Sequence, residues 1–150
     1  MKKNVNGVDI DMPPEEIAEV LALWAANAPT LSDLKSDKRA EINTACLAAI
    51  DGGFEHDGHT FDSDERSKSN IIGTATGVTT GVPLPEGFTW RTHDNQDVPM
   101  DGPGVIALGA SLLQHISAQY ALSWDLKARI DAAESPQDLD QISWPTPQAA

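Results

Sequence analysis

A long helical stretch near the C-terminal end constrains the fold more than any other feature of the sequence. The turn-forming run 101–104 precedes it, and Ser135-Pro136 follows it. The spacing between these limits is that of a helix face, and it predicts one helix over about residues 105–133. We expect this helix to be central to the fold or shared with another chain. Its apolar row recurs every four positions, at Leu108, Leu112, Ile116, Tyr120 and Trp124.

Three other stretches predict helices. Prolines and glutamates at positions 13–16 are tolerated in a first helical turn, and they predict a short helix that ends near Asn27. A second helix is expected from Thr30 or Ser32 to about Ile50, before Gly52-Gly53. The third is expected from Ser63 or Asp64 to about Thr76, and a last helical turn within 137–144. In the third helix we expect three residues to face inward, namely Ile71, Ile72 and Ala75.

Two short segments predict β-hairpins. Asp57-Gly58 lies in the middle of segment 54–61 and accepts the positive φ angles of a two-residue turn. Asp94-Asn95 is expected to turn the second hairpin, over residues 88–100, with alternate residues from Phe88 to Thr92 facing inward. Residues 5–10 predict a single strand around Asn6-Gly7. The expected fold is therefore α+β, with about four helices and two small hairpins.

We expect three parts in this chain of 150 residues. Residues 1–31 form an N-terminal strand and helix, residues 32–144 form one small α+β domain, and residues 145–150 form a flexible tail. In the first part, Ile17, Leu21 and Trp24 share one helix face. An apolar stripe of this kind needs a surface to cover it, and these three residues are the predicted partner-binding site.

The charge of the chain restricts its partners. It has 23 acidic and 10 basic residues, a formal net charge of −13. An acidic surface repels phosphate backbones, so no nucleic-acid binding is expected. No window comes near the roughly 20 apolar residues of a membrane span, and the N-terminus lacks the apolar part of a signal peptide. We therefore expect no membrane insertion and a location in the cytoplasm.

No catalytic residue and no cofactor are predicted. His56, His59 and Asp62 are weak candidates for metal ligands, but the remaining ligands are unspecified. Two exposed histidines beside a turn explain the pattern better. His93 and His115 have no partner that the sequence identifies. The single cysteine, Cys46, lies in an apolar run and predicts a small buried thiol.

Two short motifs carry a resemblance to a known family. The first is Phe54-x-x-Asp57-Gly58-x-x-Phe61-Asp62-Ser63-Asp64, and the second is Trp90-Arg91-Thr92-x-Asp94-Asn95. With the helix before them, they resemble a domain of unknown function that recurs in tail and tail-fibre assembly proteins of tailed bacteriophages and prophages. The likeness covers about residues 32–144.

The resemblance implies a structural or assembly protein of the phage tail or tail fibre, without catalysis or cofactor. Its partners would be other tail or fibre proteins, with self-association as an alternative. Its place would be the host cytoplasm during assembly and then the virion tail. Within the second motif, we expect Trp90 to anchor the core, Arg91 to pair with a carboxylate, and Asp94-Asn95 to form the turn.

Two alternatives belong to other functional classes. The first is a phage hydrolase, glycan-cleaving or metal-dependent, built on His56, His59 and Asp62. The second is a small acidic inhibitor that occupies a basic site on a host protein, for which binding would weaken with salt.

Overall fold

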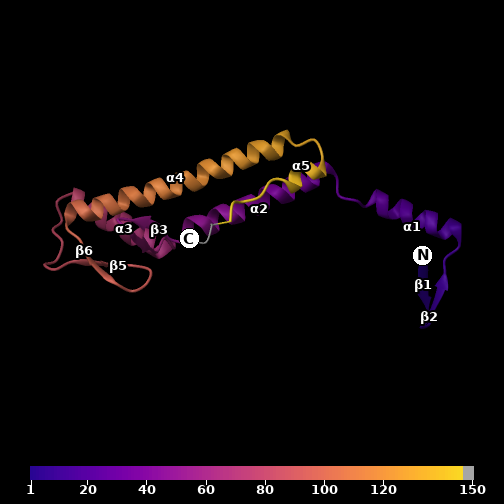
Figure 1. Cartoon of the computed structure of the whole chain (residues 1–150), viewed down its shortest axis with the longest axis horizontal. Helices are drawn as coiled ribbons and strands as arrows, with labels where there is room; N and C mark the ends of the chain where they lie inside the picture. Colours follow the sequence, from indigo (N-terminus) through magenta and orange to yellow (C-terminus); the bar gives the residue numbers. More distant parts are fainter. Residues whose placement is uncertain (147–150) are drawn as a thin grey trace.

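Helices α2 (Leu31–Asp51) and α4 (Gly102–Ala132) run antiparallel, side by side, and form the spine of an elongated molecule (Figure 1). The structure is a computed structural model that describes residues 1–146. Besides α2, α4 packs against α3 (Glu65–Thr79) and against the strand β3 (Phe54–His56). The fold is α+β with a central C-terminal helix, as predicted.

Local sequence explains both ends of α2. The Thr30 hydroxyl accepts a hydrogen bond from the Asp33 amide (3.2 Å), and the Asp33 carboxylate accepts one from the Thr30 amide (2.9 Å). This reciprocal pair satisfies donors that the first helical turn leaves open. At the other end, Gly53 has a φ of 96°, which turns the chain away from the helix.

A buried hydroxyl connects the end of α2 to the segment that starts α3. Ser63 Oγ donates to the Ile50 carbonyl (2.5 Å) and accepts from the Gly53 amide (2.8 Å). The next residue, Asp64, caps α3 by accepting from two backbone amides of its first turn. This serine, which is inaccessible to solvent, thus joins the end of α2 to the chain just before α3.

The described residues contain three two-stranded antiparallel hairpins. They are β1 (Lys2–Val5) with β2 (Val8–Asp11), β3 (Phe54–His56) with β4 (His59–Phe61), and β5 (Thr89–Arg91) with β6 (Asp97–Pro99). The predicted single strand over 5–10 is wrong. Asn6 and Gly7 have φ values of 53° and 87°, which fold the segment back on itself in a tight turn. This hairpin is one more than predicted.

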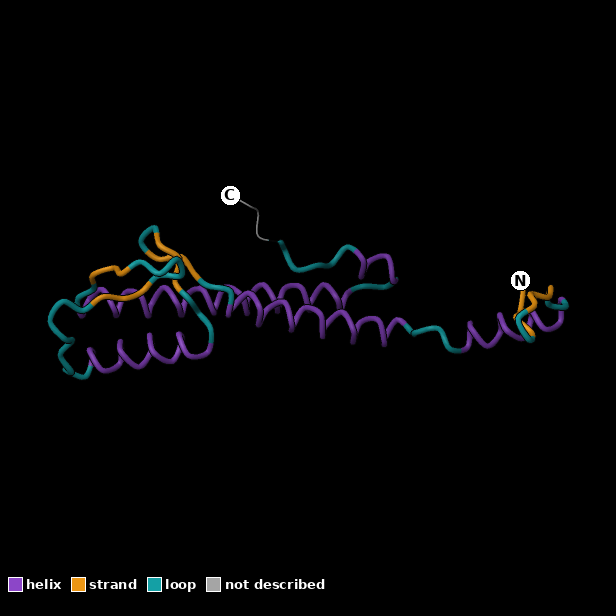
Figure 2. The backbone as a smooth tube through the Cα atoms, turned by 90° about the horizontal axis from the view of Figure 1, so that it is seen from below, coloured by secondary structure: helices purple, strands orange, loops and turns teal. Residues whose placement is uncertain are grey.

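Two separate apolar clusters lie along the spine. One cluster is formed by α2, the C-terminal half of α4 and α5 (Pro136–Asp140), and the other lies beneath the β3–β4 hairpin, between α3 and α4 (Figure 2). Cys46 is buried, as predicted. The first cluster consists of Ile42, Leu126, Ile130, Ala133, Leu139 and Ile142, and the second of Phe54, Phe61, Ile71, Leu108 and Leu112.

The apolar row from Leu108 to Trp124 does not form one buried face. Leu108 is fully buried, but Tyr120 is 41% and Trp124 65% exposed. An α-helix turns by about 100° per residue, so residues four apart drift by about 40° at each step. Four steps carry Trp124 almost to the opposite side from Leu108. The buried residues of α4 lie on a straighter seam instead, which consists of Val105, Leu108, Gly109, Leu112, Ser123, Leu126 and Ile130.

Helix α3 corrects a second prediction. It continues past the expected end at Thr76 to Thr79. Ile71 is fully buried, but its neighbour Ile72 is 44% exposed, so the inward orientation expected for Ile72 is wrong. Adjacent residues point about 100° apart on a helix, and α4 covers only one side of α3.

The described residues contain five helices, where about four were predicted. The fifth is the short helix α5. Among them, α4 is long and apolar enough to cross a membrane by length and composition, contrary to the prediction that no window comes near that content. The core helix of a globular domain meets the same criterion. Of the expected flexible tail 145–150, residues 147–150 lie outside the described part.

Candidate functional site

The N-terminal arm, which we define as residues 1–26, extends away from the spine (Figures 1 and 2). It consists of the β1–β2 hairpin and α1 (Pro14–Ala26). The Lys3 ammonium lies 2.6 Å from both carboxylate oxygens of Glu16, which joins the hairpin to the helix. The arm therefore holds its own shape through contacts within itself.

The three predicted partner-binding residues lie on α1, where no residue is buried. Ile17 is half-buried, Leu21 is 48% exposed and Trp24 is 62% exposed. Leu23, which lies outside the predicted stripe, is 61% exposed. This helix presents an apolar face that the described part of the chain leaves open to solvent. We call it the arm face, formed by Ile17, Leu21 and Trp24.

The residues of the second motif have roles within the β5–β6 hairpin. Trp90 packs partly buried against the second cluster. The Arg91 guanidinium donates two hydrogen bonds of 3.1 Å to the two carboxylate oxygens of Asp97. Asp94 accepts from the Gln96 side-chain amide (2.8 Å), and Asn95 has a φ of 63°. The core anchor, the carboxylate partner and the turn formers expected from the sequence are all found.

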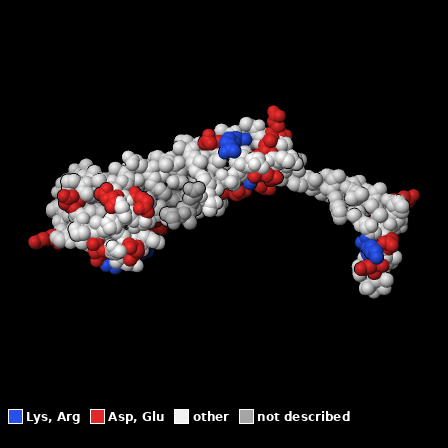
Figure 3. Space-filling model, viewed as in Figure 1, with Lys and Arg blue, Asp and Glu red and all other residues white. Residues whose placement is uncertain are grey.

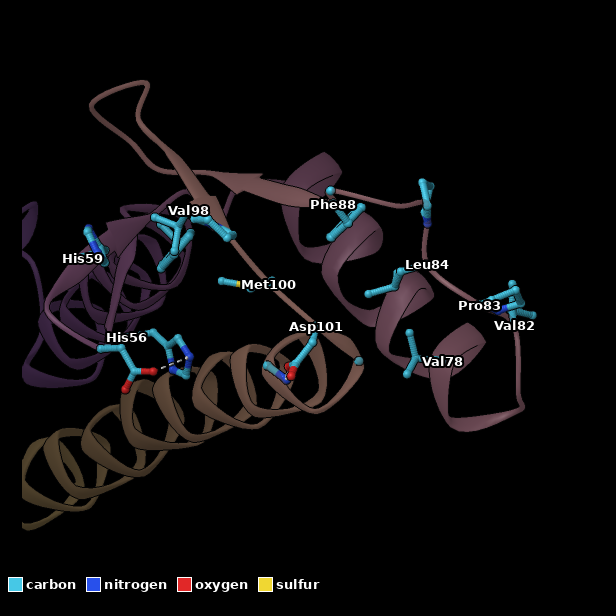
Figure 4. Close-up of a pocket in the computed structure, with 17 residues that line it drawn as sticks. His56, His59, Val78, Val82, Pro83, Leu84, Phe88, Val98, Met100 and Asp101 are labelled. Atoms are coloured by element: carbon cyan, nitrogen blue, oxygen red, sulfur yellow. Dashed lines mark hydrogen bonds and ion pairs between the residues drawn. The ribbon is translucent and has the colours of Figure 1, made fainter.

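A cavity of about 780 Å³ opens between the β3–β4 hairpin, the loop after α3 and the start of α4 (Figure 4). His56 and His59 lie at one end of it, and no lysine or arginine lines it. Segments far apart in sequence form its walls, so no local pattern could have predicted it. Most of the lining is apolar, and includes Val78, Val82, Leu84, Phe88, Val98 and Met100.

The three metal candidates are not brought together. His56 and His59 are cross-strand neighbours, but the Asp62 carboxylate lies against His93, with 2.6 Å between Oδ1 and Nδ1. His56 Nδ1 is hydrogen-bonded to the Ser111 hydroxyl (2.7 Å). The described residues contain no group of three side chains that could hold a metal ion.

The four histidines differ from the sequence-based expectation in their exposure or in their hydrogen-bond partners. His56, expected to be exposed, has a side chain only 10% exposed, and His59 is half-buried. His115, for which no partner was apparent, lies 3.1 and 3.2 Å from two carbonyl oxygens at the end of α2. His93 pairs with Asp62, whose hydrogen bond and negative charge raise the pKa of His93.

Residues 33–143 match the family described as a domain of unknown function (DUF4376), and the chain belongs to this family. The match begins in the first turn of α2, ends just after α5 and leaves the arm outside. The resemblance to a domain of unknown function is therefore correct. No curated protein and no solved structure matches the chain.

Proposed function

We propose that this chain is a structural or assembly protein that binds another protein through the arm face. The observation that carries the proposal is the exposure of Leu21 and Trp24 on a helix without a single buried residue. Complete burial of such side chains contributes about 1.5–3 kcal/mol each. Tryptophan is also enriched among the residues that dominate binding energies.

The charge of the arm indicates the chemistry of its partner. Glu15, Glu16 and Glu19 lie on α1, which has no lysine or arginine. A helix with an apolar face and acidic flanks fits a groove with an apolar floor. Lysine or arginine side chains along the rim would complement the glutamates and orient the helix.

The partner that we propose is a protein of a bacteriophage tail or tail fibre. This finer assignment is supported by the resemblance of segments 54–64 and 90–95 to phage tail proteins. The protein would then be present in the host cytoplasm during assembly and in the virion tail afterwards. We propose neither catalysis nor a cofactor for it.

The test is quantitative mass spectrometry of purified virions carrying wild-type or variant chains. Leu21→Ala with Trp24→Ala removes the arm face, and Leu47→Ala with Val82→Ala is the matched control at positions 55% and 60% exposed. We expect wild type and control in several copies per particle and the arm variant depleted, with unchanged melting temperatures. Retention of the arm variant at the wild-type level would contradict the proposal.

Absence of the chain from virions would change its proposed role from tail component to assembly factor, but not its proposed binding through the arm face. A wild-type chain that is abundant in the lysate but missing from particles would be an assembly factor. The same variants would then be compared for binding to purified tail proteins. Weak salt dependence would indicate apolar docking, whereas steep loss of affinity with salt would favour the acidic inhibitor.

The hydrolase alternative is less favoured because Asp62 bonds to His93 instead of facing His56 and His59. Peptidoglycan and polysaccharide release assays, with and without a chelator, test it directly. Activity that the chelator or His59→Ala abolishes would replace our proposal with an enzymatic one.

A further inference from the structure

Helix α4 carries a second apolar stripe on its solvent-exposed side. Steps of four and three residues alternate along it, which is the spacing of a coiled-coil seam. All six residues are exposed, including Leu113 at 56% and Trp124 at 65%. The stripe is therefore straight and about 27 Å long. We call it the outer stripe, and it consists of Ile106, Ala110, Leu113, Ser117, Tyr120 and Trp124.

The outer stripe lies on a stretch without charge. No charged residue occurs from Gly102 to Trp124, although 22% of the chain is charged. In Figure 3 the edge of the body formed by this part of α4 is white. Two copies with a net charge of −13 each repel one another over most of their surfaces. Along this stripe a second copy can approach without bringing like charges together.

Large and small residues are ordered so that the stripe complements its own reverse. When two stripes are set antiparallel about their midpoint, Leu113 of each copy faces Ser117 of the other. By the same register, Tyr120 faces Ala110. In these two kinds of pair a bulky side chain meets a small one, which favours close packing without voids.

Trp124, at the C-terminal end of the outer stripe, also faces an apolar surface of the second copy. In the same register Trp124 faces Ile106, beside a hollow of about 360 Å³ between α3 and α4. Gly109 and Ala75 line this hollow, and Ile72 gives it an exposed apolar wall. The Trp124 indole, stacked on Tyr120 with 6.3 Å between ring centroids, is placed to fill it.

We propose that α4 pairs with α4 of a second copy in an antiparallel two-fold dimer, with the axis midway between Leu113 and Ser117. A two-fold interface uses the same surface on both subunits and must complement itself. The order of residues along the outer stripe meets this requirement. The inference does not depend on the function proposed for the arm, which lies on a separate helix.

Sedimentation equilibrium of the full chain tests the dimer. Leu113→Glu adds a charge to the stripe, and Leu47→Glu adds the same charge on α2 at a position with almost the same exposure, 55% against 56%. We expect dimers for wild type and Leu47→Glu, and a folded monomer by circular dichroism for Leu113→Glu. A wild-type monomer at about 0.1 mM, or a dimer that Leu113→Glu leaves intact, would overturn the proposal.

Disulfide cross-linking tests the direction of pairing. The antiparallel register predicts that Ala110→Cys cross-links to Tyr120→Cys when the two variants are mixed, and that neither cross-links to itself. Native Cys46 is buried and does not interfere. Cross-linking of Ala110→Cys alone would show parallel pairing and overturn the proposal. A monomer that binds phosphatidylcholine vesicles through Leu113 would do the same.

Discussion

His93 and Asp62 show how a surface residue acquires its chemistry from a distant part of the chain. They are 31 positions apart, and their side chains meet at 2.6 Å where the β5–β6 loop crosses the end of β4. The His93 amide also donates to the Thr60 carbonyl (2.8 Å), which fixes the loop against that strand. The side-chain pair is exposed to solvent, so it contributes little to stability, but its titration reports on the contact.

We predict that the pKa of His93 lies above the usual value of about 6.5. Asp62→Asn should bring this pKa down, because it removes the carboxylate that raises it. The stability that the pair adds is complete below the unfolded pKa and is lost as the pH rises through the raised folded pKa. A proton NMR titration of the histidines measures the pKa of His93 in wild type and in Asp62→Asn. Equal His93 pKa values in wild type and Asp62→Asn would contradict the contact between these two side chains.

At the scale of elements, Gly109 allows α3 and α4 to approach closely near Ala75. A Cβ added at Gly109 would lie 3.3 Å from the Ala75 Cβ and 4.0 Å from the Ile71 side chain. Gly73 in α3 is different, since a Cβ there would meet nothing within 4 Å. Two helical glycines of the same pair of helices thus have opposite packing environments.

These environments predict opposite effects on stability. Gly73→Ala should raise the free energy of unfolding by about 0.5–1 kcal/mol, because alanine loses less backbone freedom in a helix. Gly109→Leu should lower it by about 1–3 kcal/mol through overpacking. Urea unfolding followed by circular dichroism provides both values. Destabilisation by Gly73→Ala, or tolerance of Gly109→Leu, would contradict the helix packing described above.

At the scale of the whole molecule, stability resides in the two clusters along the spine. The first cluster joins α2 to α4 and α5, and the second joins α4 to α3 and the β3–β4 hairpin. No residue of α1 is buried, and the β1–β2 hairpin pairs only within itself. The arm is therefore energetically separate from the body, as a segment that docks on a partner can be.

Removal of residues 1–29 should leave the body folded, with Thr30 kept as the cap of α2. We expect the free energy of unfolding to change by less than about 0.5 kcal/mol, as for surface changes without buried contacts. Ile42→Ala, at a fully buried position, should instead cost about 2–5 kcal/mol. Differential scanning calorimetry of the truncated chain and of Ile42→Ala measures both losses of stability against wild type. A truncated chain that melts as early as Ile42→Ala would show that the arm belongs to the fold.

Features that depend on neighbouring residues could be read from the sequence. The start of the second helix near Thr30, the turn at Asp57-Gly58 and the arm helix after Pro13 arise from interactions within a few positions, and the structure confirms each of them. The turn residues of the second motif, Asp94 and Asn95, belong to the same group. Local backbone geometry and hydrogen bonding suffice to specify such features.

Other features required the tertiary structure. The sequence could not indicate that α4 is buried along a straight seam, which leaves Trp124 exposed, because that depends on how α2 and α3 lie against it. The pairing of Asp62 with His93 and the cavity beside His56 also join distant segments. Such contacts are decided when helices and hairpins pack together, since periodicity marks apolar positions but not which neighbour covers them.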